Sequence, residues 1–402
     1  MAKPICPQCT GEMTHKGQKQ RADGRSKDYY RCTQCNFQTV NPVYDIDILA
    51  ENVRLAKRTQ RFQDSNRIER KAFREHARIE NAVEAYSKAI IEALRECDLS
   101  KQSQLHDIQN VEAAGIVHLS DLHFNELVQL TFNKYDFRIA SQRLHKLCTT
   151  ARSAFKAFNI QNVFVAMTGD ILNSDRRLDE LLANATNRAR ASLLAVQILK
   201  QFILDLNQDF NVSVGSVTGN ESRIQDEIGY DDLVVSDNYD YTIFEMLRML
   251  FENSDGIRFC NLDPSGDIVT VGKKNVLLIH GESMTGDVEK KVLGLIGKWA
   301  DRGIRIDLVL FGHLHCARVS DLFSRSASLV GANTYSDRGL HLIGRASQNI
   351  HIITGDDIHS MKIGVQDVNG YDGYNIDTAL ERYHPKSASK LKSKRVIFEV
   401  TI

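Results

Sequence analysis

The sequence predicts a layered α/β domain over residues 113–402, preceded by a cysteine-rich segment over 1–42 and by a helical segment with a linker over 43–112. Two observations lead to this prediction. Five short apolar runs each end in a polar or charged side chain, and stretches with helical periodicity lie between them. Apolar runs of this length suit strands buried on both faces, and their alternation with helices favours helices packed on a sheet.

Length and composition indicate a multi-domain globular protein with an uneven charge. The 402 residues allow two or three domains, and 42% hydrophobic residues are enough for a sizeable core. The formal net charge is zero, but residues 1–78 hold 16 Lys and Arg against 9 Asp and Glu, so they carry +7 and the remainder carries −7. This basic part favours an anionic partner, and we expect nucleic acid, with DNA as the preferred form.

Membrane association is not expected. No apolar stretch approaches the roughly 20 residues that cross a bilayer, and the first residues have no apolar signal core. Four of the eight cysteines form two Cys-x-x-Cys pairs, which fits a metal site in a reducing compartment better than a disulfide framework. We therefore expect a cytoplasmic protein.

The two Cys-x-x-Cys pairs are separated by 22 residues that are polar and basic, as in a projecting hairpin. Four thiolates make a closed tetrahedral zinc site, and a segment this short needs a metal to fold. The unit resembles the zinc ribbons that precede catalytic domains in transposase-like and phage DNA-processing proteins. Tyr29 and Tyr30 either stack on bases or fill the small core of the ribbon. The expected ligands of one structural zinc are Cys6, Cys9, Cys32 and Cys35.

The segment after the ribbon is expected to be helical. Residues 45–96 contain no Pro or Gly and are rich in helix formers, which predicts one or two long helices. Between residues 54 and 78 there are 9 basic and 3 acidic side chains. These charges are either an ordinary solvated helix face or an extension of the nucleic-acid surface, so that residues 1–78 as a whole would hold the strand. Apolar side chains recur at helical spacing from Ile79 to Leu94, which predicts an amphipathic helix with one apolar face.

In the α/β domain, each apolar run leads into a short polar motif. The carboxyl ends of such strands gather their polar groups at one edge of a sheet. Shorter strand-like pieces at 327–330, 351–354 and 396–401 predict a second sheet. The expected helices are 138–158, 180–207, 239–251 and 287–300. In chain order, the motifs are Asp121-Leu122-His123, Gly169-Asp170, Gly219-Asn220, His280-Gly281 and Gly312-His313-Leu314-His315.

The last motif shows the chemistry most clearly. Two histidines two residues apart, just past a strand, can direct both imidazoles into one cleft, and neutral imidazole is a common metal ligand. Gly312 is expected to let the chain turn sharply at the end of the strand. Taken alone, His313 and His315 fit two loop histidines as well as a metal site.

The five motifs in this order resemble the calcineurin-like metallophosphoesterases, over roughly residues 114–320. The resemblance implies a four-layer αββα sandwich that binds two metal ions and hydrolyses phosphoesters. Carried over to this sequence, it assigns one metal ion to three residues and the other ion to three more, with an aspartate bridging the two. These residues are Asp121, His123 and His315; Asn220, His280 and His313; and the bridging Asp170.

Two metal ions suit this reaction because a phosphoester is anionic and repels hydroxide. Ions about 3.5–4 Å apart neutralise that charge, activate water and stabilise the leaving oxygen. Mixed nitrogen and oxygen ligation suits Mn²⁺, Fe, Zn²⁺ or Ni²⁺ better than Ca²⁺. The resemblance to nucleases of this superfamily favours Mn²⁺.

One position departs from the family pattern. The family has a histidine after Gly-Asn, near the phosphate, whereas here Glu221 follows Asn220. Glu221 either donates a proton, which requires a raised pKa, or orients the neighbouring ligand. Arg223 is a candidate to clamp the phosphate, and His118 is a more distant substitute for the missing histidine.

The sequence therefore predicts a metal-dependent phosphodiesterase acting on nucleic acid, and specifically a DNA nuclease. It resembles the exonuclease branch of the superfamily, which serves recombination, repair or phage DNA processing. Two alternatives remain: a phosphatase of phosphoproteins or small phosphoesters whose ribbon serves assembly, and a DNA-binding protein whose catalytic core has lapsed. The resemblance leaves open whether the chain forms a homo-oligomer or needs a partner ATPase.

Overall fold

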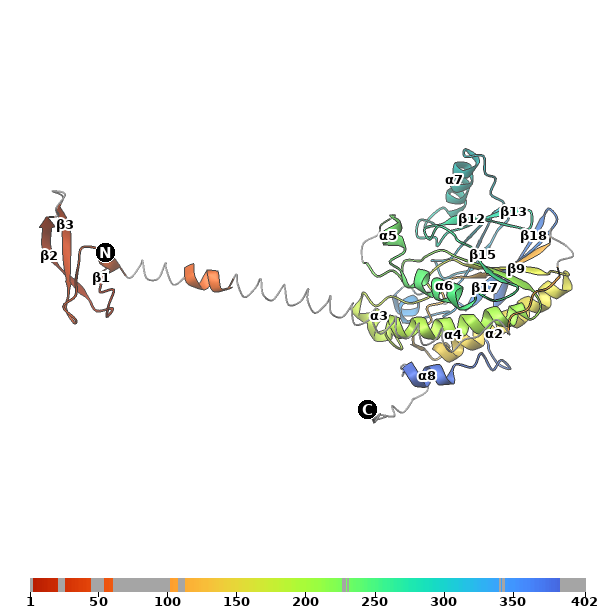
Figure 1. Cartoon of the computed structure of the whole chain (residues 1–402), viewed down its shortest axis with the longest axis horizontal. Helices are drawn as coiled ribbons and strands as arrows, with labels where there is room; N and C mark the ends of the chain where they lie inside the picture. The colour runs from red at the N-terminus through yellow and green to blue at the C-terminus, as the bar shows by residue number, and fades with distance from the viewer. Residues whose placement is uncertain are drawn as a thin grey trace. The chain divides into compact units, whose positions relative to one another are not determined.

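The structure is a computed structural model that describes residues 3–20, 26–44, 54–60, 102–107, 113–225, 229, 231–339, 341 and 344–383. The chain divides into two compact units, residues 1–82 and 83–402, which are described separately (Figure 1). Of the predicted helical segment, residues 54–60 are described and are helical. The apolar face from Ile79 to Leu94 lies outside the described residues. The predicted domain boundaries after residues 42 and 112 stay predictions.

The N-terminal unit is a small antiparallel β-fold. A hairpin and a short third strand make one sheet, and the first strand of the chain pairs with the last strand of the unit. That pair extends the ribbon fold to Tyr44. The strands are β1 (Pro4–Ile5), β2 (Met13–Gln20), β3 (Ser26–Cys32), β4 (Gln38–Thr39) and β5 (Val43–Tyr44).

The apolar core of this unit is very small. Cys6, Met13 and Cys32 are buried, and Tyr30 and Phe37 are among the side chains that pack against them. Tyr30 thus fills the core, one of the two roles considered for the tyrosine pair. Because so few apolar side chains are buried, we expect the fold to need a bound metal for its stability.

The second unit contains a six-stranded sheet with the order β11-β10-β9-β6-β17-β18. The first four of these strands run parallel, and β17 runs antiparallel to β6. The strands are β6 (Ala114–Leu119), β9 (Asn162–Met167), β10 (Asn211–Ser216), β11 (Ile257–Phe259), β17 (Ser347–Thr354) and β18 (Asp357–Gly364).

A five-stranded sheet with the order β12-β13-β14-β16-β15 packs against the first sheet. Its strands are β12 (Asp267–Val271), β13 (Lys274–Leu278), β14 (Leu308–Phe311), β15 (Arg318–Val319) and β16 (Phe323–Arg325). A separate two-stranded ladder consists of β7 (Val128–Gln129) and β8 (Lys134–Tyr135).

Three of the expected helices agree closely with the structure, whereas the helix expected over 180–207 is divided into two, because the backbone is extended at Asn184 and Asn187 caps a new helix. None of the helices among the described residues is long and apolar enough to cross a bilayer. They are α2 (Phe137–Ala157), α3 (Leu178–Ala183), α4 (Arg188–Asn207), α5 (Asp232–Val235), α6 (Tyr239–Leu250), α7 (Val288–Ala300) and α8 (Asp377–Tyr383), with a π-helical turn η1 (Tyr335–Gly339).

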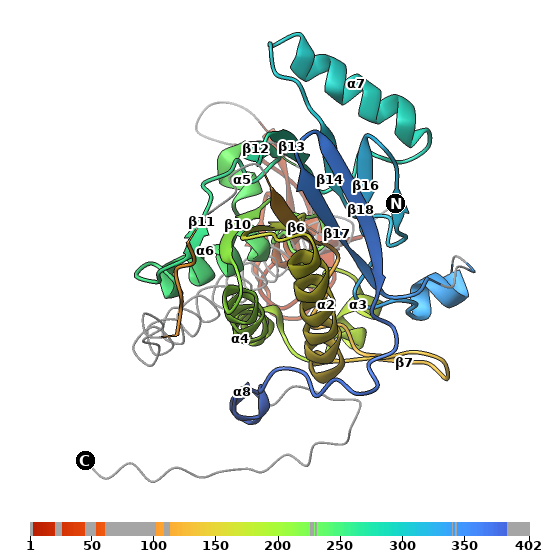
Figure 2. The same cartoon turned by 90° about the vertical axis from the view of Figure 1, so that its right-hand side faces the viewer.

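Three apolar clusters define four layers. The largest lies between the six-stranded sheet and helices α2, α4 and α6, a second lies between the two sheets, and a third joins the five-stranded sheet to α7. Alternation along β6 shows the layering, because Val117 belongs to the first cluster and Ile116 to the second. Figure 2 shows α7 and α2 on opposite sides of the sheets. The predicted αββα sandwich is confirmed.

The second sheet is not built from the pieces that the sequence indicated. Residues 351–354 form part of β17, which belongs to the first sheet. Residues 327–330 are buried but form no strand, because their polar groups bond to the Asp121 loop instead: the Leu329 N–H and the Ser328 hydroxyl both donate to the Asp121 carbonyl, at 3.0 Å. Residues 396–401 lie outside the described residues.

Candidate metal centre

The seven predicted ligands come together just past the carboxyl ends of five strands. Three of these strands, β6, β9 and β10, belong to the six-stranded sheet, and two, β13 and β14, belong to the five-stranded sheet. The prediction of one edge of one sheet was therefore too simple, because the site lies where the edges of two packed sheets meet. Two clusters of side chains result, which we call the first and the second ligand set.

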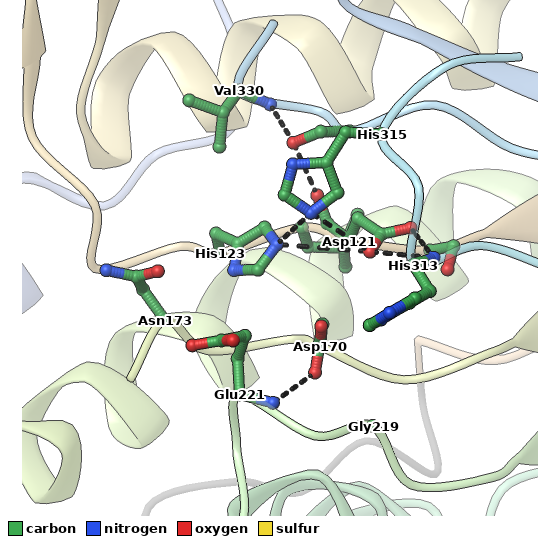
Figure 3. Close-up of polar contacts among 12 residues, drawn as sticks. Asp121, His123, Asp170, Asn173, Gly219, Glu221, His313, His315 and Val330 are labelled. Atoms are coloured by element: carbon green, nitrogen blue, oxygen red, sulfur yellow. Dashed lines mark hydrogen bonds and ion pairs between the residues drawn. The ribbon is translucent and has the colours of Figure 1, made fainter. Parts of the chain in front are cut away.

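The first ligand set consists of Asp121, His123 and His315 (Figure 3). The Nε2 atoms of the two histidines are 3.2 Å apart. Asp121 Oδ1 lies 3.4 Å from His315 Nε2 and 4.0 Å from His123 Nε2. Two imidazole nitrogens and a carboxylate oxygen thus point at one small volume.

The second ligand set consists of Asp170, Asn220, His280 and His313. His280 Nε2 lies 3.1 Å from Asp170 Oδ2, 2.9 Å from Asn220 Oδ1 and 3.3 Å from His313 Nδ1. His313 Nδ1 lies 2.8 Å from the same Asn220 oxygen. This grouping of the side chains is the one that the family resemblance implied.

The second set has the properties of a cation site. The His280 Nδ1 atom lies 2.7 Å from the Thr168 carbonyl, to which it donates, so the neutral ring keeps a lone pair on Nε2. Asp170 Oδ2 is buried and lies 3.1 Å from His280 Nε2, from which it accepts no hydrogen bond when the ring is neutral with its proton on Nδ1. Crowding buried acceptors in this way is costly unless a cation binds them. Bridging of two ions by Asp170 stays a prediction. The charge of Asp170 does reach the first set, where it offsets part of the lowering that burial imposes on the pKa of His123.

Opposing charges set the protonation of the site. Burial alone lowers the pKa of His280, but the carboxylates of Asp170 and Asp121 outweigh it and raise that pKa to about 10. Burial and the neighbouring His315 lower the pKa of His123 to about 4. Burial would raise the pKa of Asp121, yet His315 and the other histidines bring it below its ordinary value. A proton therefore competes with a metal ion at His280.

Five of the seven ligands have a left-handed backbone conformation, which non-glycine residues adopt rarely. Each such residue costs about 1–3 kcal/mol and persists only where the surrounding structure fixes it, and such residues cluster at functional sites. The values of φ are 50° for Asp121, 43° for His123, 55° for Asp170, 65° for His313 and 52° for His315.

Asp240, at the start of α6, fixes two of the ligand loops. Its Oδ2 accepts hydrogen bonds from the backbone N–H groups of Asp170 at 2.8 Å and Gly219 at 2.9 Å, and its Oδ1 accepts one from Ile171 at 2.9 Å. Burial, followed by the charge of Asp170, raises the pKa of Asp240 to about 6. The sequence gives no sign of this role, because an aspartate in the first turn of a helix is common.

Gly312 has a different role from the expected one. Its φ is not positive, and the left-handed residue at this bend is His313. A Cβ on Gly312 would overlap the Ser120 hydroxyl and an Asp121 carboxylate oxygen. The His313 N–H can therefore donate to both oxygens of Asp121, at 3.0 and 2.9 Å. Glycine is needed here for close approach and not for a turn.

Glu221 is placed to orient a ligand. Its Oε1 accepts a hydrogen bond from Asn220 Nδ2 at 2.8 Å, which turns the Asn220 oxygen toward the two histidines. The Glu221 N–H donates to Asp170 Oδ1 at 2.7 Å (Figure 3). Burial and the charge of Asp170 raise the pKa of this carboxyl. The geometry favours the orienting role over proton donation.

Arg223 lies at the side of the second set. Its Nε donates to the Gln225 carbonyl at 3.1 Å, and its Nη1 lies 4.0 Å from Glu282, two residues after His280. Its side chain is 20% exposed, so the guanidinium is accessible to a ligand. Phosphate binding by Arg223 stays a prediction. His118 is fully buried and its Nε2 lies 2.9 Å from Thr168 Oγ1, so it is a core residue.

Two other arginines stabilise the loop over residues 219–225. Arg176 Nη2 donates to the Asn220 carbonyl at 2.9 Å, and its Nε donates to the Ser174 hydroxyl at 3.1 Å. Arg188, which sequence reasoning missed, donates to the Arg223 carbonyl at 2.8 Å. These bonds hold the backbone of the loop and so fix the position of Asn220.

The four cysteines of the N-terminal unit also come together, with all four sulfur atoms within 4.8 Å of one another. The backbone N–H groups of Cys35 and Gln34 lie 3.5 and 3.4 Å from Cys32 Sγ. They stabilise a thiolate and lower the pKa of Cys32 to about 6. A closed set of four thiols with N–H donors to sulfur fits a structural zinc.

No family model and no curated protein matches the sequence. The comparison with solved structures gives similarities with low TM-scores. A predicted phosphoesterase from Streptococcus pneumoniae TIGR4 is 15% identical over 65% of this chain and 93% of its own, with a TM-score of 0.28. Calcineurin-like phosphoesterase YfkN from Bacillus subtilis is 10% identical over 68% and 96%, with a TM-score of 0.30. Vps29 with Zn²⁺ from Entamoeba histolytica is 10% identical over 62% and 99%, with a TM-score of 0.27.

These matches include calcineurin-like phosphoesterases, the family that the five strand-end motifs resemble. Identities and TM-scores this low give no information about substrate, metal or catalytic residues. The basis for a function is therefore the site itself, with its two ligand sets between two sheets.

Proposed function

We propose that this protein is a two-metal-dependent phosphodiesterase that hydrolyses nucleic acid, with DNA as its substrate. The observation that carries the proposal is the pair of adjacent ligand sets, each combining buried carboxylate and imidazole groups. When bound, two divalent transition-metal ions supply positive charge to an anionic phosphodiester and make the attacking water more acidic. Mixed nitrogen and oxygen ligands favour Mn²⁺, with Fe, Zn²⁺ and Ni²⁺ as the other candidates.

The chain contributes ligand geometry that is fixed before substrate arrives. His280 is held in one tautomer by Thr168, and Asn220 is turned by Glu221 so that its oxygen faces the site. Asp240 and Gly312 fix the backbone of the ligand loops. Such preorganisation lets binding energy serve the transition state instead of rearranging the site.

We assign Arg223 to the phosphate and Glu221 to Asn220. A guanidinium can donate two parallel hydrogen bonds to phosphate oxygens, and Arg223 is partly exposed beside the second set. Glu221 keeps its acceptor oxygen on the Asn220 amide. Its raised pKa leaves proton donation to the leaving group as the alternative role.

The N-terminal unit supports nucleic acid as the substrate. Lys16, Lys27 and Arg31 are exposed on the β2–β3 hairpin. Basic side chains on one element bind phosphate backbones through counterion release, without regard to base sequence. We propose that residues 1–78 hold the DNA strand. DNA binding should be strongest at low salt and should weaken steeply as the salt concentration rises. A truncated chain lacking residues 1–78 should lose most of this binding.

The proposal is tested by incubating the purified protein with Mn²⁺ and with single- and double-stranded DNA and RNA, both linear and circular. We expect cleavage of DNA that a chelator and Asp170→Asn both abolish. Comparison of linear with circular substrates separates exonuclease from endonuclease action. Hydrolysis of small phosphomonoesters with DNA left intact would instead identify a phosphatase. A single zinc per chain with no hydrolysis would identify a DNA-binding protein.

A further inference from the structure

A short stretch of chain beside the first ligand set carries exposed aromatic and basic side chains. The π-helical turn η1 (Tyr335–Gly339) has no buried residue, and Tyr335 is 61% exposed. Arg338 in the same turn and Arg345 after it are also exposed, and neither forms an ion pair with another described residue. Figure 2 shows the turn, in light blue, at the edge of the α/β unit. We call Tyr335, Arg338 and Arg345 the rim surface.

The start of this stretch is tied to the first ligand set by hydrogen bonds. Asn333 Nδ2 donates to Glu126 Oε1 at 2.7 Å, and the Glu126 N–H donates to the His123 carbonyl at 2.9 Å. Glu126 is only 6% exposed, so this connection is an internal one. Because Tyr335 is two residues from Asn333, the Tyr335 ring stands close to the ligand loop that carries His123.

The end of the stretch returns to the same ligand set. A Cβ on Gly344 would lie 3.6 Å from the His315 carbonyl oxygen, so the backbone at Gly344 packs against that ligand. Arg345 directly follows Gly344. The rim surface therefore borders the first ligand set at both of its ends.

The turn holds the Tyr335 ring in a defined position. The N–H groups of Asn333 and Ser336 donate to each other's side-chain oxygens at 2.9 and 2.8 Å, and the Asp337 N–H donates to the Asn333 carbonyl at 3.0 Å. A Cβ on Gly339 would lie 3.3 Å from Tyr335 Cδ2, so one side of the ring packs against the Gly339 backbone. Turns of the π type are rare and are frequent at functional sites.

These side chains suit a strand of nucleic acid. An exposed aromatic ring stacks on a base whatever the base is, and the base must be unpaired to offer it a free face. A guanidinium donates two parallel hydrogen bonds to phosphate oxygens. One accessible ring with two arginines beside it therefore matches the bases and phosphates of a single strand.

We propose that the rim surface binds a single strand of nucleic acid next to the phosphodiester that is cleaved. Tyr335 stacks on one unpaired base, and Arg338 and Arg345 bind the neighbouring phosphates. The inference rests on the proposed function and narrows its substrate to single-stranded DNA and to strand ends with unpaired bases. Stacking of a base on an aromatic side chain changes binding by about 5- to 150-fold.

Photocrosslinking locates the strand without catalysis. The probe is a short single-stranded DNA in which 5-iodouracil replaces thymine, added to the full chain with Zn²⁺ and with Asp170→Asn to prevent cleavage. We expect irradiation to crosslink the DNA to the peptide that contains Tyr335. Tyr335→Ala should abolish this crosslink and Tyr335→Phe should retain it. A digest without the Tyr335 crosslink would overturn the proposal, and crosslinks to residues 1–78 in the same digest verify that DNA was bound.

Cleavage kinetics with Mn²⁺ measure what the rim surface contributes at the metal centre. Tyr335→Ala should lower kcat/KM for single-stranded DNA by about 5- to 150-fold. The double change Arg338→Ala and Arg345→Ala should flatten the slope of log kcat/KM against log salt by about 1.4, since each phosphate contact on a single strand contributes about 0.7. Arg305→Ala is the matched control, because Arg305 is 84% exposed before the amino end of β14. Variants that behave like the control would overturn the proposal.

The two experiments separate this inference from the proposed function. Cleavage of DNA combined with no Tyr335 crosslink leaves the proposed function standing and removes the rim surface. A Tyr335 crosslink in a protein that cleaves no phosphodiester supports strand binding by the rim surface and removes the nuclease.

Discussion

The N-terminal ribbon and the two ligand sets of the α/β unit place candidate metal ligands in opposite structural settings. In the ribbon, four cysteines lie within 30 residues of one another and form much of a core that has almost no other apolar content. In the α/β unit, the ligands span residues 121–315 and follow strands with large apolar clusters on both sides. The metal should therefore determine the fold of the first unit and only the chemistry of the second.

The difference also appears in what orients the ligands. In the ribbon, the backbone N–H groups of Gln34 and Cys35, two and three residues after Cys32, donate to the Cys32 sulfur. The Asp170 and Asn220 loops depend on residues distant in sequence, such as Asp240 and Arg176. A site whose ligands are oriented by sequence neighbours forms only when its metal is bound. A site whose ligands are oriented by distant residues is formed by the fold before the metal binds.

The largest expected effect is the loss of the ribbon fold without zinc. Chelation, or the double change Cys9→Ser and Cys35→Ser, should unfold the ribbon completely and leave the α/β unit folded, because only the ribbon lacks an apolar core. Limited proteolysis measures this directly, since the ribbon should become sensitive while the larger unit stays protected. Cys316→Ser, at an exposed cysteine outside the ribbon, is the control. A ribbon that stays protected after chelation would contradict the comparison.

The next effect is on activity alone. Asp170→Asn should lower kcat by about 10³-fold or more, because it removes a charged ligand worth several kcal/mol in the transition state. The melting temperature of the α/β unit should change little. The exposed Asp372→Asn should alter neither quantity. Unfolding caused by Asp170→Asn would mean that the fold of the α/β unit, like that of the ribbon, depends on its metal site.

Asp240→Asn tests whether the site is built before the metal arrives. An amide has one acceptor oxygen where the carboxylate accepts bonds on two, so the variant should lose about 1–3 kcal/mol of unfolding free energy. Metal affinity at the second set should fall with it, as calorimetry of metal binding would show. Glu252→Gln, at an exposed site just after the same helix, should be neutral. Unchanged metal affinity in the Asn variant would show that Asp240 does not position the ligands.

Glu221 separates orientation from acid catalysis. Glu221→Gln keeps an acceptor oxygen for Asn220, so we expect activity within a few-fold of wild type, whereas Glu221→Ala should lose about 10- to 100-fold in metal affinity. A pH–rate profile for each variant is the measurement. Equal losses of activity in the Gln and Ala variants, together with disappearance of the alkaline limb of the pH–rate profile, would identify Glu221 as the proton donor instead.

The smallest effect is a pH dependence of metal binding at the second set. In the metal-free protein, the pKa of His280 is raised to about 10, so its protonated form stabilises the fold fully below the ordinary value of 6.5, and that stability is lost as pH rises through 10. A metal ion must displace this proton. Its affinity should rise about tenfold per pH unit between pH 7 and 9.

Indicator competition at several pH values measures that slope. The exposed His359→Gln should leave it unchanged. The ribbon should show at least as steep a dependence over the same range, because zinc binding must also remove the proton of Cys35, whose pKa is raised to about 12. A flat affinity at the second set would show that His280 is neutral before the metal binds.

Much of the site could be predicted from the sequence, because each ligand belongs to a recognisable local pattern. Asp121, Asp170 and His313 all stand just after a buried apolar run, and strand ends of a parallel sheet meet at one edge. The cysteine pairs were equally local. Three of the four expected helices were predicted closely since their periodicity and caps are also properties of neighbouring residues.

Contacts between distant segments could not be predicted from the sequence. The sequence assigned residues 351–354 to the second sheet, although β17 pairs with β6, and it missed Asp240 entirely. It gave Gly312 a turning role that belongs to His313. In each case the deciding factor was a partner far away in the chain, which no local pattern specifies.

The sequence by itself thus determined which side chains supply the chemistry, because the identity of a ligand and its place at a strand end are local. Only the tertiary structure decided how they work together. It brought two sheet edges into contact, held Asp121 and Asp170 in a left-handed conformation, and fixed the backbone of Asn220 through Arg176. These features depend on close packing between residues up to about two hundred positions apart, and packing at that range is set by the whole fold.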